Sequence, residues 1–197
     1  MSKVSTIQLN SGPNIKVNLY DVKTFIEQIA DVGSKMVVLP ENFALMPEND
    51  ADYIKHAEEL GDGQIQNYIS DLASSYKIWI VGGTIPIKSK DKNRVMASTI
   101  TYNEKGEQVS LYNKIHLFDV TLPKSQESYN ESKYFMPGDK IEVIDTPIGR
   151  AGIACCYDLR FPELFRLQQE QKVDVIILPA SFTEQTGKVH WETLIKA

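Results

Sequence analysis

Cysteine is nearly absent from this chain of 197 residues, which contains only Cys155 and Cys156. Neighbouring cysteines rarely reach disulfide geometry, so the chain has no framework of the kind that holds small secreted domains together. Long apolar runs are absent too, and no stretch approaches the roughly 20 residues of a membrane-spanning helix. The N-terminal stretch MSKVSTIQLNSGPN lacks the apolar region of a signal peptide. These absences predict a soluble, cytoplasmic protein.

An excess of positive charge is also missing, since 21 basic residues face 26 acidic ones and give a formal charge of −5. No basic block could neutralise the phosphates of a nucleic acid, so we expect neither nucleic acid nor membrane as a partner. His56, His116 and His190 are scattered, without cysteines or carboxylates at ligand spacing, so we expect no metal and no cofactor. The 42% hydrophobic content predicts one globular domain over residues 1–197.

Strand-like and helix-like patterns alternate through the first part of the chain. Residues 4–10 and 36–41 have the composition of buried strands, and apolar residues at helical spacing lie between them. A second helical pattern over 65–76 precedes a strand-like run at 78–87. This order predicts an α/β fold that begins with βαβ units.

The second half adds antiparallel strands to this plan. Residues 97–103 and 108–114 resemble a hairpin, and Gly106 can adopt the positive φ that its turn needs. A polar loop over about 116–139 comes next. The remaining segments are three strand-like runs and one helix, at 140–147, 150–156, 173–181 and about 161–171. We therefore predict mixed sheets.

Three polar residues each follow a buried strand. Glu41 follows MVVLP, Lys114 follows VSLYN and Cys156 follows GIAC. Ligands bind beyond the carboxyl ends of strands in open α/β sheets, and a carboxylate, an ammonium and a thiol suit acyl transfer. Glu41 could take the proton of the attacking Cys156 thiol. Lys114 could hold the oxyanion with the backbone N–H of Tyr157, and its charge would also favour the thiolate.

Each of these residues also has an ordinary interpretation. A buried cysteine usually acts as a small hydrophobic residue, and an acid or a lysine at a strand end is usually a solvated loop residue. The spacing alone leaves both interpretations open. It also leaves open whether Cys155 or Cys156 is the nucleophile.

Three sequence blocks together resemble the nitrilase superfamily of carbon–nitrogen hydrolases, and they stand in that family's order. They are PENF at 40–43, NKIHLFD at 113–119 and CYDLRFPEL at 156–164. The resemblance implies an αββα sandwich and a Glu–Lys–Cys triad on Glu41, Lys114 and Cys156. Cys155 is then a core residue on the opposite face of its strand.

A fourth block, YNESKYFMPGD at 129–139, resembles the family's loop that carries a second glutamate. That glutamate is Glu131, which would bridge Lys114 and the substrate amide; an exposed loop acid is the alternative interpretation. Arg160 follows the nucleophile turn and could pair with a substrate carboxylate. Its alternative is a structural ion pair with an acid such as Asp158 or Glu163.

The segment PASFTEQTGKVHWE at 179–192 resembles one that closes the pocket and begins an interface helix in the family's amidase branches. This resemblance implies a homodimer through the helices near Phe165 and Trp191, with His190 as a packing or capping residue. The implied activity is hydrolysis of a small carboxylate-bearing amide through a Cys thioester. Deaminated glutathione is slightly favoured over an ω-amide such as 2-oxoglutaramate, because of the segment PASFT.

The chain stops at Ala197 within a helical pattern that has no Gly or Asn cap. Members of the family continue with further strands, so we expect the αββα sandwich to lack its C-terminal part. A second hypothesis follows, in which the chain is an inactive, truncated homologue that acts as a binding or oligomerisation module. Release of ammonia from an amide distinguishes the two hypotheses.

Overall fold

A computed structural model describes residues 3–121 and 128–197 of the protein. Its larger sheet has seven strands, and β1, β2 and β3 are parallel neighbours in it. Strand β5 pairs antiparallel with β3, β4 and β6, and parallel with β9. The strands are β1 (Val4–Thr6), β2 (Met36–Val38), β3 (Trp79–Val81), β4 (Ile85–Lys88), β5 (Val95–Tyr102), β6 (Gln108–Asn113) and β9 (Phe135–Met136). The βαβ start and the mixed sheet are therefore confirmed.

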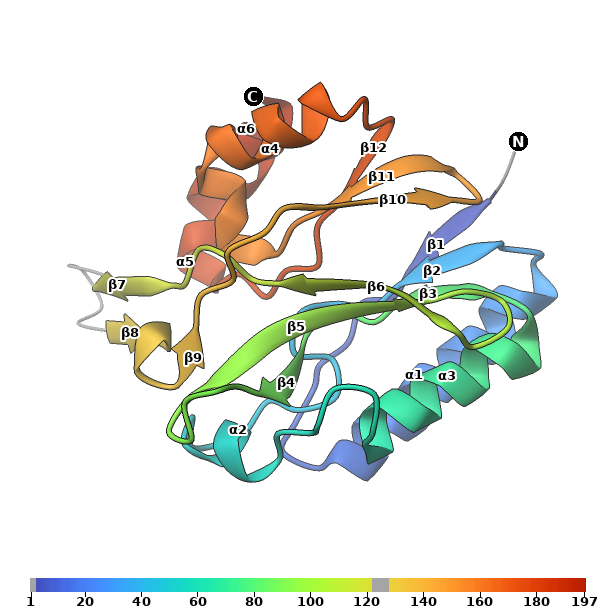
Figure 1. Ribbon diagram of the computed structural model, residues 1–197, viewed down its shortest axis with the longest axis horizontal. Helices are drawn as coiled ribbons and strands as arrows, with labels where there is room; N and C mark the ends of the chain where they lie inside the picture. Colours follow the sequence, from blue (N-terminus) through green and yellow to red (C-terminus); the bar gives the residue numbers. More distant parts are fainter. Residues whose placement is uncertain (1–2, 122–127) are drawn as a thin grey trace.

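The smaller sheet has three strands and is also mixed. Strand β10 (Glu142–Thr146) pairs antiparallel with β11 (Gly149–Ile153), which pairs parallel with β12 (Val175–Ile177). A separate two-stranded arm, β7 (Asp119–Thr121) and β8 (Ser128–Asn130), extends from the sheets (Figure 1).

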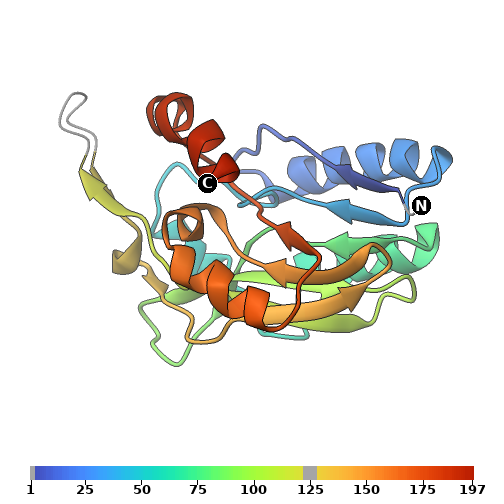
Figure 2. The ribbon, with the colours of Figure 1, turned by 90° about the horizontal axis from the view of Figure 1, so that it is seen from above.

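The two sheets face each other and helices cover their outer faces. Helices α1 (Ile15–Asp31) and α3 (Gln64–Tyr76) lie on the larger sheet, and α4 (Pro162–Glu170) lies on the smaller one, on the opposite side of the molecule (Figure 2). A core between the sheets contains buried residues of both, among them Met36, Val81, Tyr112, Ile144, Ile153 and Ile177. These four layers confirm the predicted αββα sandwich.

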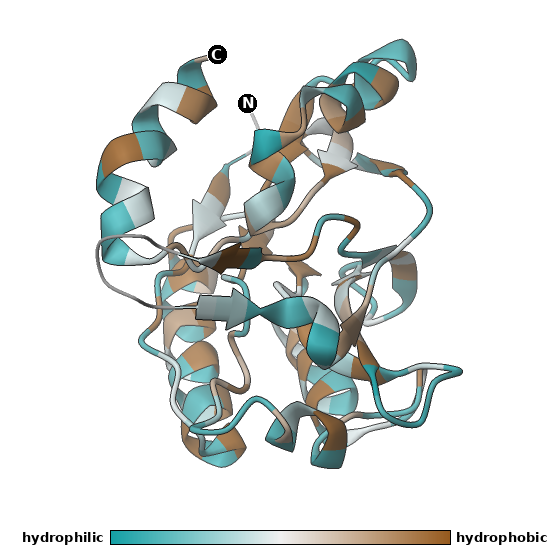
Figure 3. Cartoon of the chain, turned by 90° about the vertical axis from the view of Figure 1, so that its left-hand side faces the viewer, coloured by the Kyte–Doolittle hydropathy of each residue, from teal (hydrophilic) through white to brown (hydrophobic). Residues whose placement is uncertain are grey.

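Local sequence explains where the helices begin. The side chain of Asn14 accepts hydrogen bonds from two backbone N–H groups of α1, at Lys16 and Val17. Glu58, from a preceding loop, accepts the N–H groups of Ile65 and Gln66 in the first turn of α3. The helices of the chain carry both hydrophobic and hydrophilic residues (Figure 3), and α1 and α3 pack apolar residues of one face into the core.

Two segments differ from the sequence-based expectation. The strand predicted at 78–87 is split into β3 and β4, because Gly83 adopts a φ of +49° in a turn where a Cβ would collide with the carbonyl oxygen of Pro40. The loop predicted at 116–139 contains β7, β8, β9 and the short helix η1 (Glu131–Lys133). Residues 122–127 of that loop lie outside the described residues.

The described chain also contains four short helical segments. They are α2 (Asp52–Lys55), α5 (Glu184–Thr186), η3 (Gly187–Trp191) and α6 (Glu192–Lys196). A further short helix, η2 (Cys156–Arg160), follows β11 and carries the predicted nucleophile. Within the described residues, no helix is long and apolar enough to cross a membrane.

Candidate active site

A pocket of about 330 Å³ opens at the strand ends and gathers all six residues singled out from the sequence. Its lining includes Glu41, Lys114, Glu131, Cys156, Tyr157 and Arg160. These residues come from segments that are far apart in the chain: the end of β2, the end of β6, η1 and η2. The carboxyl ends of strands from both sheets therefore meet at one chemical site.

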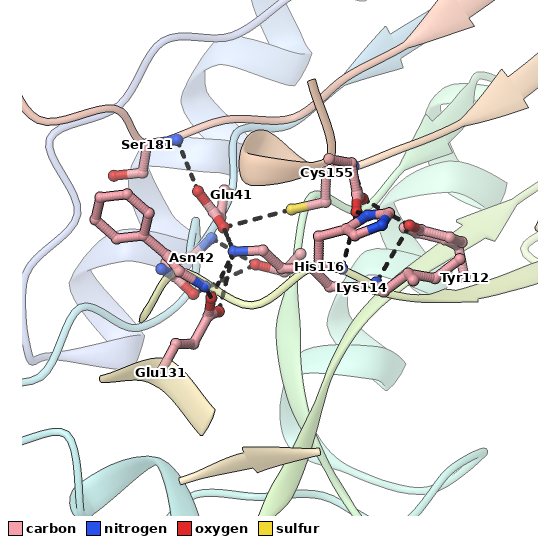
Figure 4. A network of polar contacts seen from close by, with 12 residues as sticks. Glu41, Asn42, Tyr112, Lys114, His116, Glu131, Cys155 and Ser181 are labelled. Atoms are coloured by element: carbon pink, nitrogen blue, oxygen red, sulfur yellow. Dashed lines mark hydrogen bonds and ion pairs between the residues drawn. The ribbon is translucent and has the colours of Figure 1, made fainter. Parts of the chain in front are cut away.

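Lys114 lies at the centre of the polar contacts and is only 1% exposed. Its Nζ is 2.8 Å from Glu41 Oε1 and 3.0 and 2.9 Å from the two oxygens of Glu131 (Figure 4). Burial alone would lower the pKa of Lys114, but the carboxylates and the nearby thiols more than offset this, and the pKa lies well above its usual value. The two carboxylates in contact with Lys114 therefore favour its ammonium form.

Glu131 is held in place and is not the exposed loop acid of the alternative interpretation. Its side chain is 18% exposed, and its Oε2 accepts the backbone N–H of Phe118 at 2.6 Å as well as the Lys114 ammonium. Burial raises the pKa of Glu131, although Lys114 opposes this change. A single ammonium thus serves two carboxylates.

Glu41 is fixed by both of its oxygens and by the turn that follows it. Oε1 accepts from Lys114, and Oε2 accepts the backbone N–H of Ser181 at 2.8 Å. The next residue, Asn42, has a φ of +55°, and its N–H is bonded to Thr84 Oγ1 at 2.9 Å. This turn directs the carboxylate into the pocket.

Cys156 is the first residue of η2 and has a φ of +45°, which is unusual for a residue other than glycine. Its N–H donates to the carbonyl oxygen of Pro179 at 2.8 Å, and the residue lines the pocket together with Glu41. Burial first, and Glu41 second, raise the pKa of the Cys156 thiol, and together they outweigh the opposing effect of Lys114. Lys114 does favour the thiolate, as expected, but burial and Glu41 outweigh its effect, so the pKa of the resting thiol is raised.

Cys155 is fully buried in the core between the sheets, as expected for a core residue. Its thiol nevertheless also reaches the site, because Sγ lies 3.4 Å from Glu41 Oε1 (Figure 4). Strand β11 ends at Ile153, so Cys155 lies beyond the strand and the alternation of faces does not apply to it. Sequence periodicity could not reveal this contact.

Arg160 lies at the pocket wall between aromatic side chains. Its guanidinium lies over the rings of Tyr157 and Phe182, at 5.6 and 5.9 Å from their centres, and its Nη2 is 2.9 Å from His190 Nδ1. Among the described residues it forms no ion pair, so the alternative pairing with Asp158 or Glu163 is not observed. His190, expected to pack or cap, contacts this guanidinium instead.

The arrangement can perform acyl transfer. A thiol lies beside a carboxylate that can accept its proton, and a buried ammonium touches the same carboxylate. Sequence reasoning missed the backbone N–H of Ser181, which contacts Glu41, because a backbone donor has no side-chain signature. It also missed a buried network around Asp158 that lies behind the thiol.

Comparisons with known proteins identify the family and the fold of this chain. Residues 3–197 match the carbon-nitrogen hydrolase family. The chain is 39% identical to the deaminated glutathione amidase of Yersinia enterocolitica over 197 residues, which cover 100% of this chain and 68% of that protein. It is 36% identical to the omega-amidase NIT3 of Saccharomyces cerevisiae over 201 residues, which cover 99% of this chain and 68% of that protein. The crystal structure of yeast Nit3, a member of branch 10 of the nitrilase superfamily, superimposes with a TM-score of 0.85 at 33% identity. The superposition covers 98% of this chain and 69% of the Nit3 chain.

Proposed function

Because the chain belongs to the carbon-nitrogen hydrolase family, we propose that it is a thiol-dependent amidase. Its substrate would be a small, carboxylate-bearing primary amide, and its products a second carboxylate and ammonia. The observation that carries this proposal is the buried Lys114 ammonium, which touches two glutamates beside the Cys156 thiol. Burying three ionisable groups together costs desolvation free energy, and proteins concentrate such groups at functional sites.

The first half of the proposed reaction forms a thioester. Glu41 takes the proton of the Cys156 thiol while Sγ attacks the amide carbon, and the carbonyl π electrons move to oxygen. Lys114 and the N–H of Tyr157 stabilise the oxyanion. The C–N bond then breaks, and Glu41 passes the proton to the departing nitrogen, which leaves as ammonia.

The second half hydrolyses the thioester. Glu41 removes a proton from a water molecule, which attacks the thioester carbon, and the C–S bond breaks to give the carboxylic acid product and the free thiol. Glu131 holds the Lys114 ammonium from the opposite side and orients the substrate amide. Since the pKa of the resting thiol is raised, the base is needed at the moment of attack.

Arg160 would recognise the substrate carboxylate, at the far end of the substrate from the amide. Its guanidinium lines the pocket and has no ion-pair partner among the described residues, so a substrate carboxylate can take that role. The hydroxyl-bearing residues Ser181, Thr183 and Thr186 line the same pocket. They slightly favour deaminated glutathione over 2-oxoglutaramate, because a peptide-like substrate offers more polar groups to bind.

The proposed assembly is a homodimer through the helices near Phe165 and Trp191. Trp191 is 37% exposed, Val189 is 66% exposed and Ile195 is 54% exposed, so this segment presents apolar side chains on the surface. The ring of Trp191 also packs on Phe182, which lines the pocket. A partner subunit here would support the pocket wall.

An ammonia-release assay tests the proposed function. The protein is incubated with deaminated glutathione, 2-oxoglutaramate and a neutral amide of similar size. We expect release from a carboxylate-bearing amide in the native protein and none after Cys156→Ala. Absence of release from every amide would refute the amidase and favour an inactive binding or oligomerisation module.

A further inference from the structure

Asp158 is a fully buried carboxylate that the proposed reaction does not use. Its two oxygens are surrounded by four donors. Oδ2 accepts the hydroxyl of Tyr112 at 2.6 Å and the backbone N–H of Cys155 at 2.8 Å. Oδ1 accepts the backbone N–H of His116 at 3.0 Å and lies 2.7 Å from the Nδ1 of the same residue (Figure 4).

These four donors come from the two chain segments that carry the reactive groups. Tyr112 and His116 lie two residues before and two residues after Lys114, and Cys155 is the residue directly before Cys156. One carboxylate therefore joins a side chain before the ammonium and the backbone after it to the backbone of the residue before the thiol. Glu41 also contacts both segments, but through the side chains of Lys114 and Cys155, whereas Asp158 accepts backbone N–H groups from both.

Further contacts make this connection rigid. The hydroxyl of Tyr112 also accepts the N–H of Ile115, at 3.3 Å, directly after Lys114. The ring of His116 stacks on Phe161, with ring centres 3.7 Å apart and planes 7° from parallel. Phe161 follows η2 and donates its N–H to the carbonyl oxygen of Asp158 at 2.9 Å. The two segments are thus joined at the Asp158 carboxylate and again at the stacked rings.

The backbone of Cys156 needs such support, because its φ of +45° is strained for a residue with a Cβ. Asp158 accepts the N–H of the preceding residue, and Pro179 accepts the N–H of Cys156 itself. A turn held at these points cannot relax into an ordinary conformation without losing buried hydrogen bonds.

We propose that Asp158 and His116 are positioning residues that set the spacing between the Cys156 thiol and the Lys114 ammonium. The effect on turnover rests on the proposed function, whereas the effect on thiol reactivity does not. Neither residue touches the substrate in this proposal. Both act through the backbone of the two reactive segments.

Asp158→Asn is the direct test, because it keeps the shape of the side chain. Asparagine has one acceptor oxygen, and its NH2 group can only donate, so the donors on one side of the network lose their acceptor. Tyr112→Phe and His116→Gln are milder variants, because both leave the Asp158 carboxylate in place. The first removes the hydroxyl that contacts Asp158 and Ile115, and the second removes the ring that contacts Asp158 and Phe161. Asp174→Asn is the control, since Asp174 accepts the N–H of Arg150 at 2.8 Å outside the pocket.

The first readout is the rate of alkylation of Cys156 by iodoacetamide as a function of pH, followed by mass spectrometry of the peptide. Charged groups line the pocket with the thiol, and the titratable Cys155 precedes it in the chain. These charged groups are Glu41, Asp50, Lys114, Glu131 and Arg160. We expect Asp158→Asn to lower the rate about tenfold or more and to move the profile to higher pH, because the thiol leaves the ammonium. His116→Gln and Tyr112→Phe should change both quantities in the same direction by less, and Asp174→Asn should stay within about twofold.

The second readout is kcat and KM for the preferred amide. Displaced reactive groups should lower kcat about tenfold or more and leave KM almost unchanged, because the substrate-binding wall is intact. If Asp158→Asn does not fold, the two milder variants decide the question. Native alkylation profiles in the folded variants, with only a lower melting temperature, would overturn the positioning role. Altered profiles in a protein that hydrolyses no amide would support positioning and refute the amidase.

Discussion

Replacing Lys114 by methionine removes the positive charge at the centre of the site and nearly preserves the length of the side chain. Lys114 is 1% exposed and its ammonium contacts both Glu41 and Glu131. If it holds the oxyanion, its loss removes roughly 3 to 4 kcal/mol of transition-state stabilisation. Turnover should therefore fall by about two to three orders of magnitude, at about 1.4 kcal/mol per tenfold change.

The same substitution has a stability consequence that is separate from catalysis. Without the ammonium, two buried carboxylates face each other, and breaking a buried pair in this way costs about 3 to 5 kcal/mol when the remaining charge stays ionised. The pKa of a glutamate in the folded variant would rise above its unfolded value. The folded state would then bind more protons than the unfolded state at pH values between the two, so the variant should gain stability as the pH falls through this range.

Three measurements check this reasoning: ammonia release, circular dichroism, and urea unfolding at about pH 5 and about pH 7.5. The double variant Lys114→Met with Glu131→Gln is the matched control, because it removes one of the two uncompensated carboxylates and should recover stability without activity. Lys114→Arg should not restore turnover, since a planar guanidinium does not fit a fully buried site shaped for an ammonium. Near-normal rates in a folded Lys114→Met variant would refute an electrophilic role for this lysine.

Four further outcomes are expected. Cys156→Ala should abolish single-turnover ammonia release, whereas Cys155→Ala should keep most of it, because only Cys156 lines the pocket; equal loss in both would mean that the nucleophile is misassigned. Glu131→Gln should lower turnover. It should also become more stable than the native protein as the pH rises above the ordinary glutamate range, because the raised pKa of Glu131 means that folding disfavours its charged form. Urea unfolding at two pH values measures this difference in stability, and a difference that narrows as the pH rises would contradict the prediction. Arg160→Lys should raise the KM of a carboxylate-bearing amide about tenfold and leave the KM of a neutral amide unchanged. Steady-state kinetics on both amides measure these values, and an equal rise for both would argue against carboxylate recognition. Light scattering of the full-length protein should give a dimer, and a charged substitution at Trp191 should weaken it; a monomer at micromolar concentration would rule out the proposed interface.

The sequence predicted those site residues whose reactive side chain directly follows a recognisable strand. Glu41, Lys114 and Cys156 each follow a run that is recognisable as a buried strand, and strand ends converge at one edge of a sheet. Helical and strand periodicities predicted the α/β alternation and the mixed sheets, whereas the αββα layers were implied by the resemblance to a known family. The resemblance to a known family added Glu131, which no periodicity would have identified.

Contacts between distant segments were not predictable in the same way. Asp158 is two residues from the nucleophile, but its partners Tyr112 and His116 are 46 and 42 residues away in the sequence. Nothing local distinguishes a buried aspartate of this kind from an exposed turn residue. The contact of Cys155 with Glu41 spans 114 residues and depends on where β11 ends, and strand ends are the least certain part of a sequence-based assignment.

The site depends on turns rather than on strands. Asn42, beside the proposed base, and Cys156, the proposed nucleophile, both have positive φ values, and such a backbone costs of order 1–3 kcal/mol at each residue. Each turn is held by a partner from another segment, Thr84 for Asn42 and Pro179 for Cys156. The strands bring the reactive groups to one edge, but these contacts between segments hold the turns that direct the thiol and the carboxylate into the same pocket. The packing of the two sheets against each other is therefore part of the catalytic geometry.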